Sequence, residues 1–132
     1  MTKLQIVEMD HIVLNVADVE RSVGFYTKTL GLKGERLDEF RAGKVGFPSV
    51  RINDCTLIDI VRSEDSGGAV TRNLDHFCLV SEKTDLDQLV EDLKSQGVVV
   101  LREPVSRWGA RGQATSIYIQ DPDGNEIEIR CY

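Results

Sequence analysis

The sequence predicts an α+β fold made of two modules, each with the element order β-α-β-β-β. An Asp-His dipeptide opens each half of the chain, at positions 10–11 and 75–76, which lie 65 positions apart. An amphipathic helical stretch that ends at a glycine follows each dipeptide. Each half then closes with a carboxylate between two isoleucines, in Ile58-Asp59-Ile60 and Ile127-Glu128-Ile129. A repeat of this length is typical of two similar structural units.

The chain length is that of one ordinary domain. Its 132 residues are enough for a hydrophobic core, so we expect a single domain over 1–132. The repeat divides this domain into module one, 5–65, and module two, 71–132. A small, polar and acidic stretch at 63–68 is predicted to link them.

The composition excludes several classes of partner. With 16 basic and 22 acidic residues the net charge is −6, which argues against binding to nucleic acid or to an anionic membrane. No apolar run approaches the roughly 20 residues of a membrane span, and the first residues do not resemble a signal peptide. Cys55, Cys78 and Cys131 lack metal-type spacing. We therefore expect reduced thiols in a cytoplasmic protein.

The first half begins with a predicted strand over 9–16. Asp18 is a suitable N-cap for the following helix, and Gly31 stands where a left-handed C-terminal residue belongs. Glycines and a proline break residues 33–50 into short strands. Two further strands, 50–52 and 56–62, flank an Asn-Asp turn.

The second half repeats this order from a strand over 74–80. Thr84 or Asp85 is expected to cap the helix, and Gly97 to end it. A strand over 98–101, a loop over 103–112 and two last strands follow. The last strands, 115–119 and 126–130, are joined by a turn at Asp121-Pro122-Asp123-Gly124, in which proline and glycine favour the turn angles.

The two histidines of the chain, His11 and His76, occupy equivalent positions in the repeat, as do Asp59 and Glu128. A single strand histidine is more often a packed core residue, and a single strand carboxylate is more often solvated. Two matched pairs instead favour a site for a borderline divalent ion: Zn, Ni, Co, Mn or Fe. Three protein ligands would leave positions open for water or substrate, which is typical of a catalytic site.

The chain also resembles a known family, the vicinal oxygen chelate superfamily. That family holds glyoxalase I, fosfomycin-resistance transferases, extradiol dioxygenases and bleomycin-resistance proteins. The matching segments are Asp10-His11-Ile12-Val13-Leu14, Phe25-Tyr26-Thr27-Lys28-Thr29-Leu30-Gly31-Leu32, Asp75-His76, and Ser116-Ile117-Tyr118 through Asp121-Pro122-Asp123-Gly124-Asn125 to Glu128.

The resemblance implies that the two modules curl into half-open barrels around a metal ion. It implies His11, His76 and Glu128 as the ligands of one divalent metal per site. It also implies that the metal chelates two adjacent oxygens of a small substrate and stabilises an oxyanion or enolate, by Lewis-acid polarisation.

Glyoxalase-type members of the family place a fourth ligand where Asp59 stands, and a ligand carboxylate moves the proton. We therefore expect Glu128 and Asp59 as catalytic residues, with Asp59 as a candidate fourth ligand or base. Asp59 is one methylene shorter than the usual glutamate, so a longer distance or a bridging water is an alternative. An ordinary polar residue at a strand end is another.

Three other branches of the family remain as alternatives. Extradiol dioxygenases normally add a further histidine, and this chain has only two. Fosfomycin-type thiol transferases use a lysine where Trp108 stands and an arginine beyond the chain's last residue, Tyr132. Bleomycin-resistance proteins are metal-free binding modules that lack the metal triad. We accordingly expect an enzyme, most like a glyoxalase-type lyase or isomerase.

Residues 105–113 are the candidate substrate lid, with glycines that permit movement. Arg107 and Arg111 could hold a carboxylate, and Trp108 could cover an apolar portion of the substrate. The resemblance to the transferases adds Ser116 and Tyr118 to the expected substrate-binding residues. The alternative for the lid is an ordinary exposed loop.

The resemblance also carries an expectation about assembly. In the similar small enzymes the barrels are completed between chains. We therefore expect a C2 homodimer with two shared sites, in which His11 faces His76 and Glu128 of the partner subunit.

Overall fold

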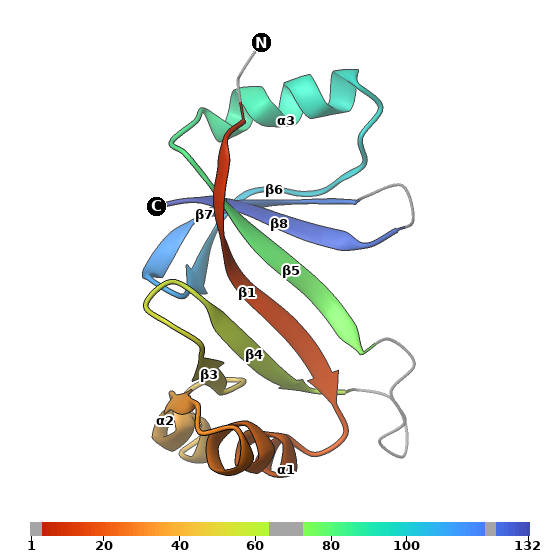
Figure 1. Cartoon of the computed structure of the whole chain (residues 1–132). Coiled ribbons are helices and arrows are strands. Elements are labelled where there is room, and N and C mark those ends of the chain that lie inside the picture. Colours follow the sequence, from red (N-terminus) through yellow and green to blue (C-terminus); the bar gives the residue numbers. More distant parts are fainter. Residues whose placement is uncertain (1–3, 64–72, 121–123) are drawn as a thin grey trace. The chain divides into compact units, whose positions relative to one another are not determined.

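The structure is a computed structural model that describes residues 4–63, 73–120 and 124–132. The chain divides into two units (Figure 1). Unit 1 consists of Met1–Asp10 and His76–Tyr132, and unit 2 consists of His11–Asp75. Strand β1 (Ile6–Val16) gives its first residues to unit 1 and its last residues to unit 2.

Unit 2 has the element order β-α-β-β-β with one short helix added. After β1 it contains α1 (Val19–Gly24), which continues as the π-helical turn η1 (Phe25–Thr29), then β2 (Lys33–Glu35), α2 (Leu37–Arg41), β3 (Ser49–Arg51) and β4 (Leu57–Arg62). The strand order is β2-β3-β4-β1. β1 and β4 are parallel, and the other pairs are antiparallel.

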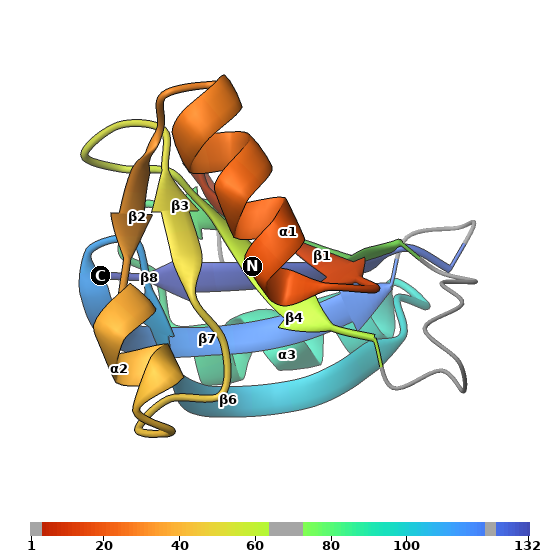
Figure 2. The same cartoon turned by 90° about the horizontal axis from the view of Figure 1, so that it is seen from below.

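Local signals set both ends of the first helix. Oδ1 of Asp18 accepts a hydrogen bond of 3.0 Å from the backbone N–H of Arg21, and Gly31 has a φ of +74°. Figure 2 shows α1 lying across β3 and β4. The buried core between the helix and these strands consists of Val19, Val23, Val50 and Ile60. The predicted cap and the predicted glycine are both confirmed.

Unit 1 repeats the order with β5 (Leu74–Ser81), α3 (Leu86–Ser95), β6 (Val100–Gly109), β7 (Gly112–Gln120) and β8 (Glu126–Cys131). The strand order is β5-β8-β7-β6, with β5 parallel to β8. Asp85 caps α3 by accepting from the N–H of Gln88 over 3.1 Å, and Gly97 has a φ of +79°. The core under the helix is Leu86, Leu89, Val90, Ile117 and Ile129.

The predicted loop over 103–112 is wrong, because β6 and β7 form one long hairpin. Their pairing runs to Gly109 and Gly112, across a two-residue turn (Figure 1). Pro104 lies at a register shift between Arg102 and Val105, where its missing N–H interrupts the ladder without ending the strand. The expected lid over 105–113 is therefore a hydrogen-bonded hairpin. The short helix α2 was also missed.

The predicted fold class, α+β with two β-α-β-β-β modules, is confirmed. The predicted linker beyond Ser63 and the turn residues Asp121-Pro122-Asp123 lie outside the described residues. Gly124, the last residue of that turn, has a φ of +87°. Among the described helices, none is long and apolar enough to cross a membrane.

Candidate functional site

In unit 1, the strand register brings His76 and Glu128 to one face. Glu128 on β8 pairs with Cys78 on the parallel strand β5, and His76 precedes Cys78 by two residues. Residues two apart on a strand share a face, and so do directly paired residues. Nε2 of His76 lies 3.2 Å from Oε1 of Glu128, whose side chain is only 1% exposed.

Unit 2 has the same register offset between His11 and Asp59. Asp59 on β4 pairs with Val13 on β1, and His11 precedes Val13 by two residues. Nε2 of His11 lies 3.8 Å from Oδ2 of Asp59, and both side chains are buried. Oδ1 of Asp59 accepts a 2.5 Å hydrogen bond from the hydroxyl of Ser49 on β3. Each unit thus contains a histidine and a carboxylate that face one another.

Hydroxyl groups hold both oxygens of Glu128. Ser116 donates to Oε2 over 2.7 Å, and Tyr118 donates to Oε1 over 3.1 Å. Burial, helped by the charge of Glu128, raises the pKa of Tyr118, so its hydroxyl keeps the proton that it donates. Burial, together with the charge of Glu128, likewise raises the pKa of the Cys78 thiol. The Tyr118 ring also lies edge-on to the imidazole of His76, with centroids 5.6 Å apart.

The buried guanidinium of Arg130 is a part of the site that the sequence did not indicate. Nη1 donates to Oε2 of Glu128 over 3.1 Å, and Nη2 donates to the carbonyl oxygens of Arg107 and Gly112, each over 2.9 Å. Burial acts to lower the pKa of Arg130, but Asp10 and Glu128 outweigh it, and this pKa lies above its ordinary value. Its spacing from Glu128 could have indicated it, because residues two apart on one strand lie on the same face.

Asp10 completes this buried network. Its carboxylate lies 3.7 Å from Nε of Arg130, and it accepts hydrogen bonds from the N–H of Ala110, over 2.8 Å, and from the hydroxyl of Tyr132. Gly109 packs directly against the pair: a Cβ there would lie 2.5 Å from Cζ of Arg130. In the Asp-His dipeptide at 10–11, the aspartate therefore has a structural role.

Arg36 is an unusual residue of unit 2. It lies in the left-handed region with a φ of +59°, which is uncommon for a non-glycine residue. Its guanidinium lies over the Phe47 ring, 4.8 Å from the centroid. Burial lowers the pKa of Arg36, and the charge of Asp59 opposes that shift. No motif or repeat in the sequence pointed to this residue.

The predicted substrate-binding residues of the hairpin are partly accessible. Arg111 is exposed, forms a 2.7 Å ion pair with Glu8 and lies over the Tyr132 ring. Arg107 and Trp108 are partly buried in β6. Their contact with a substrate stays a prediction, as it does for the two hydroxyl residues that bind Glu128.

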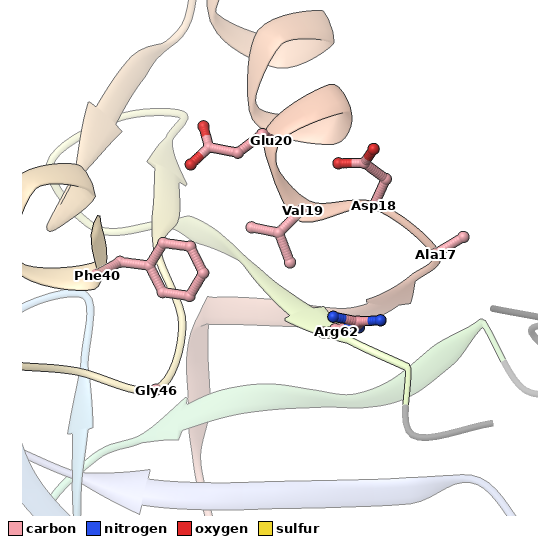
Figure 3. Close-up of a pocket in the computed structure, with 7 residues that line it drawn as sticks. All are labelled: Ala17, Asp18, Val19, Glu20, Phe40, Gly46 and Arg62. Atoms are coloured by element: carbon pink, nitrogen blue, oxygen red, sulfur yellow. The ribbon is translucent and has the colours of Figure 1, made fainter. Parts of the chain in front are cut away.

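Unit 2 also contains an open pocket of about 530 Å³ (Figure 3). Phe40 and Val19 point toward one another across it. Arg62 on β4 lines the pocket, so alternation along the strand places Asp59 on the opposite face. The described residues that line it include none of the predicted site residues: they are Ala17, Asp18, Val19, Glu20, Phe40, Gly46 and Arg62.

The site geometry agrees with the family assignment. The model of the Glyoxalase/Bleomycin resistance protein/Dioxygenase superfamily matches residues 8–129. The chain belongs to this superfamily. The match includes both histidines and both carboxylates of the two half-sites.

Two relatives in sequence and one solved structure are similar to the chain. The virulence protein STM3117 of Salmonella typhimurium is 32% identical over 124 residues, covering 94% of this chain and 83% of that protein. A lactoylglutathione lyase of Neisseria meningitidis serogroup A is 28% identical, with coverage of 90% and 86%. The Mn(II)-bound glyoxalase of Novosphingobium aromaticivorans has a TM-score of 0.74 at 17% identity, covering 98% of this chain and 40% of that one. At this low identity, the last similarity shows a shared fold alone.

Proposed function

We propose that this protein is a metal-dependent vicinal-oxygen-chelate enzyme, with His11, His76 and Glu128 as ligands of one divalent ion per site. The observation that carries the proposal is the 3.2 Å approach of an imidazole nitrogen of His76 to a buried carboxylate oxygen of Glu128. Membership of the superfamily supports it. Zn, Ni, Co, Mn and Fe(II) are the candidate ions.

The donor chemistry of these residues fits such an ion. Imidazole nitrogen and carboxylate oxygen are ligands that borderline divalent metals accept. His76 and Glu128 lie on one face of adjacent strands, so both could bind the same ion without any change in strand pairing. The hydroxyl of Ser116 orients the carboxylate through Oε2, as expected of a group that supports a metal ligand.

The reaction that we propose is a glyoxalase-type lyase or isomerase reaction on a small molecule with two adjacent oxygens. A bound divalent ion would supply Lewis-acid polarisation of those oxygens. Glu128 and Asp59 are the candidate groups to move a proton, with Asp59 as a candidate fourth ligand. The 28% identity to a lactoylglutathione lyase over 90% of the chain supports this branch.

We further propose a C2 homodimer with two shared sites. A strand with exposed apolar residues supports this assembly: Ile6, Val7 and Met9 on β1 are 43%, 52% and 37% exposed. In the proposed dimer, His11 of one chain faces His76 and Glu128 of the partner subunit. A cytoplasmic location remains a prediction from the sequence.

One experiment separates the proposed reaction from the other branches. The protein, loaded with each candidate metal in turn, is incubated in D₂O with lactoylglutathione and with a panel of small α-hydroxycarbonyl compounds. We expect deuterium to exchange into the C–H of the hydroxyl-bearing carbon next to the carbonyl, as detected by NMR. This exchange should be lost in Glu128→Ala.

The other branches would leave different signatures in the same samples. Oxygen consumption with a catechol would indicate a dioxygenase. Loss of free thiol with an electrophilic substrate would indicate a transferase. Tight binding of a small molecule without turnover or metal would indicate a binding protein. Any of these results in place of deuterium exchange would overturn the proposed reaction.

A further inference from the structure

The two oxygens of Glu128 have different surroundings. Oε2 accepts from the hydroxyl of Ser116 over 2.7 Å and from Nη1 of Arg130 over 3.1 Å. Oε1 accepts from the hydroxyl of Tyr118 over 3.1 Å and faces Nε2 of His76 at 3.2 Å. Oε1 therefore adjoins another predicted ligand of unit 1, the imidazole of His76.

The charge of Arg130 makes Oε2 a poor position for a cation. A carboxylate oxygen has two lone pairs, and Ser116 and Arg130 together occupy both. The guanidinium is fully buried, so its repulsion of a divalent ion is only weakly screened. Its Nη2 bonds to two backbone carbonyls, which hold the side chain in place, and the guanidinium packs against Gly109.

We propose that Ser116 and Arg130 are positioning residues that hold Oε2 of Glu128, so that Oε1 alone is presented to the metal, as a monodentate ligand. This inference rests on the proposed metal site and adds the ligand mode of Glu128.

Two matched variants test the assignment, because each removes one hydroxyl from one oxygen of the same carboxylate. Ser116→Ala removes a donor to Oε2, and Tyr118→Phe removes the donor to Oε1. Binding of Co(II) to the metal-free protein is measured by titration, and the visible spectrum of the Co(II) protein reports its coordination. Urea unfolding of the metal-free proteins checks that both variants are folded.

We expect Ser116→Ala to weaken Co(II) binding by about 10- to 100-fold, as is common when a group that orients a ligand is lost, and to change the spectrum. Ser116→Thr keeps the hydroxyl and should restore binding to within a few fold. Tyr118→Phe should bind Co(II) at least as tightly as wild type, because the lost hydroxyl shares the ligating oxygen with the ion.

Wild-type binding and spectrum in Ser116→Ala would overturn the inference. Equal losses in Ser116→Ala and Tyr118→Phe would also overturn it, because the two oxygens would then be equivalent. If Ser116→Ala does not fold, Arg130→Lys tests the same oxygen, with the same expected loss and the same contrary result. A wild-type protein that binds no Co(II) would instead refute the proposed metal site, and with it this inference.

Discussion

Nε2 of His76 lies 3.2 Å from Oε1 of Glu128, on adjacent parallel strands. The equivalent strands of unit 2 place His11 and Asp59 in the same register, but Nε2 of His11 lies 3.8 Å from Oδ2 of Asp59. Asp59 is one methylene shorter than Glu128, and Ser49 binds one of its oxygens. The two half-sites therefore share their register and differ in the reach of the carboxylate.

Asp59→Ala tests whether the shorter carboxylate is a ligand. If Asp59 binds the ion, the variant should lose metal affinity and turnover together, because one of four ligands is missing. Elemental analysis and an activity assay measure both. Ser49→Ala is a matched comparison that removes the 2.5 Å hydrogen bond and keeps the carboxylate, so its losses should be smaller than those of Asp59→Ala. Unchanged metal content in Asp59→Ala would favour a three-ligand site and shift the reaction toward a dioxygenase or a transferase.

Gly109→Ala tests the packing around the buried ion pair. The added Cβ would lie 2.5 Å from Cζ of Arg130 and 2.7 Å from Oδ1 of Asp10, and neither side chain is exposed. Overpacking of this kind should lower the free energy of unfolding by about 1–3 kcal/mol, measured by urea denaturation.

A glycine with free space around it provides the control for this variant. Gly24 lies at the end of α1 with no atom within 4 Å of an added Cβ. Gly24→Ala should therefore be neutral or raise the free energy of unfolding by up to about 1 kcal/mol. Equal effects at the two positions would mean that Gly109 is not packed as described.

Exchange of chains between inactive variants tests the shared sites. In a mixed dimer of His11→Ala and Glu128→Ala, one site collects both lesions and the other contains all three intact ligands. Random pairing makes about half of the dimers mixed, so activity should recover to roughly a quarter of wild type if the two sites act independently.

Native mass spectrometry first has to show that the mixture contains mixed dimers. If such a mixture stays inactive, each site is built from a single chain, and the proposed shared sites are wrong.

Much of the fold could be predicted because its signals are local. Asp18 and Asp85 cap helices through backbone groups three residues away, and Gly31 and Gly97 end them at positive φ. The hairpin could not be predicted in the same way. Pro104 interrupts the ladder at a register shift, and only the pairing of β6 with β7 shows that the strand continues beyond it.

The site could be predicted in part, and for a similar reason. The repeat selected both histidines and both carboxylates, because each recurs at an equivalent position. Arg130 has no counterpart in that repeat, because the equivalent position of β4 is occupied by Val61. One of its partners, Asp10, is 120 positions away in the sequence, so no local pattern joins these two residues.

The metal content of the purified protein tests whether His11, His76 and Glu128 bind a divalent ion. Elemental analysis of wild type and His76→Ala, with the exposed variant Lys94→Ala as a control, should find about one divalent ion per chain in wild type and control. His76→Ala should lose most of its ion, because two remaining ligands bind by orders of magnitude more weakly. A His76→Ala protein that holds the ion as tightly as wild type, or a wild type that binds none of the candidate metals, would contradict the assignment.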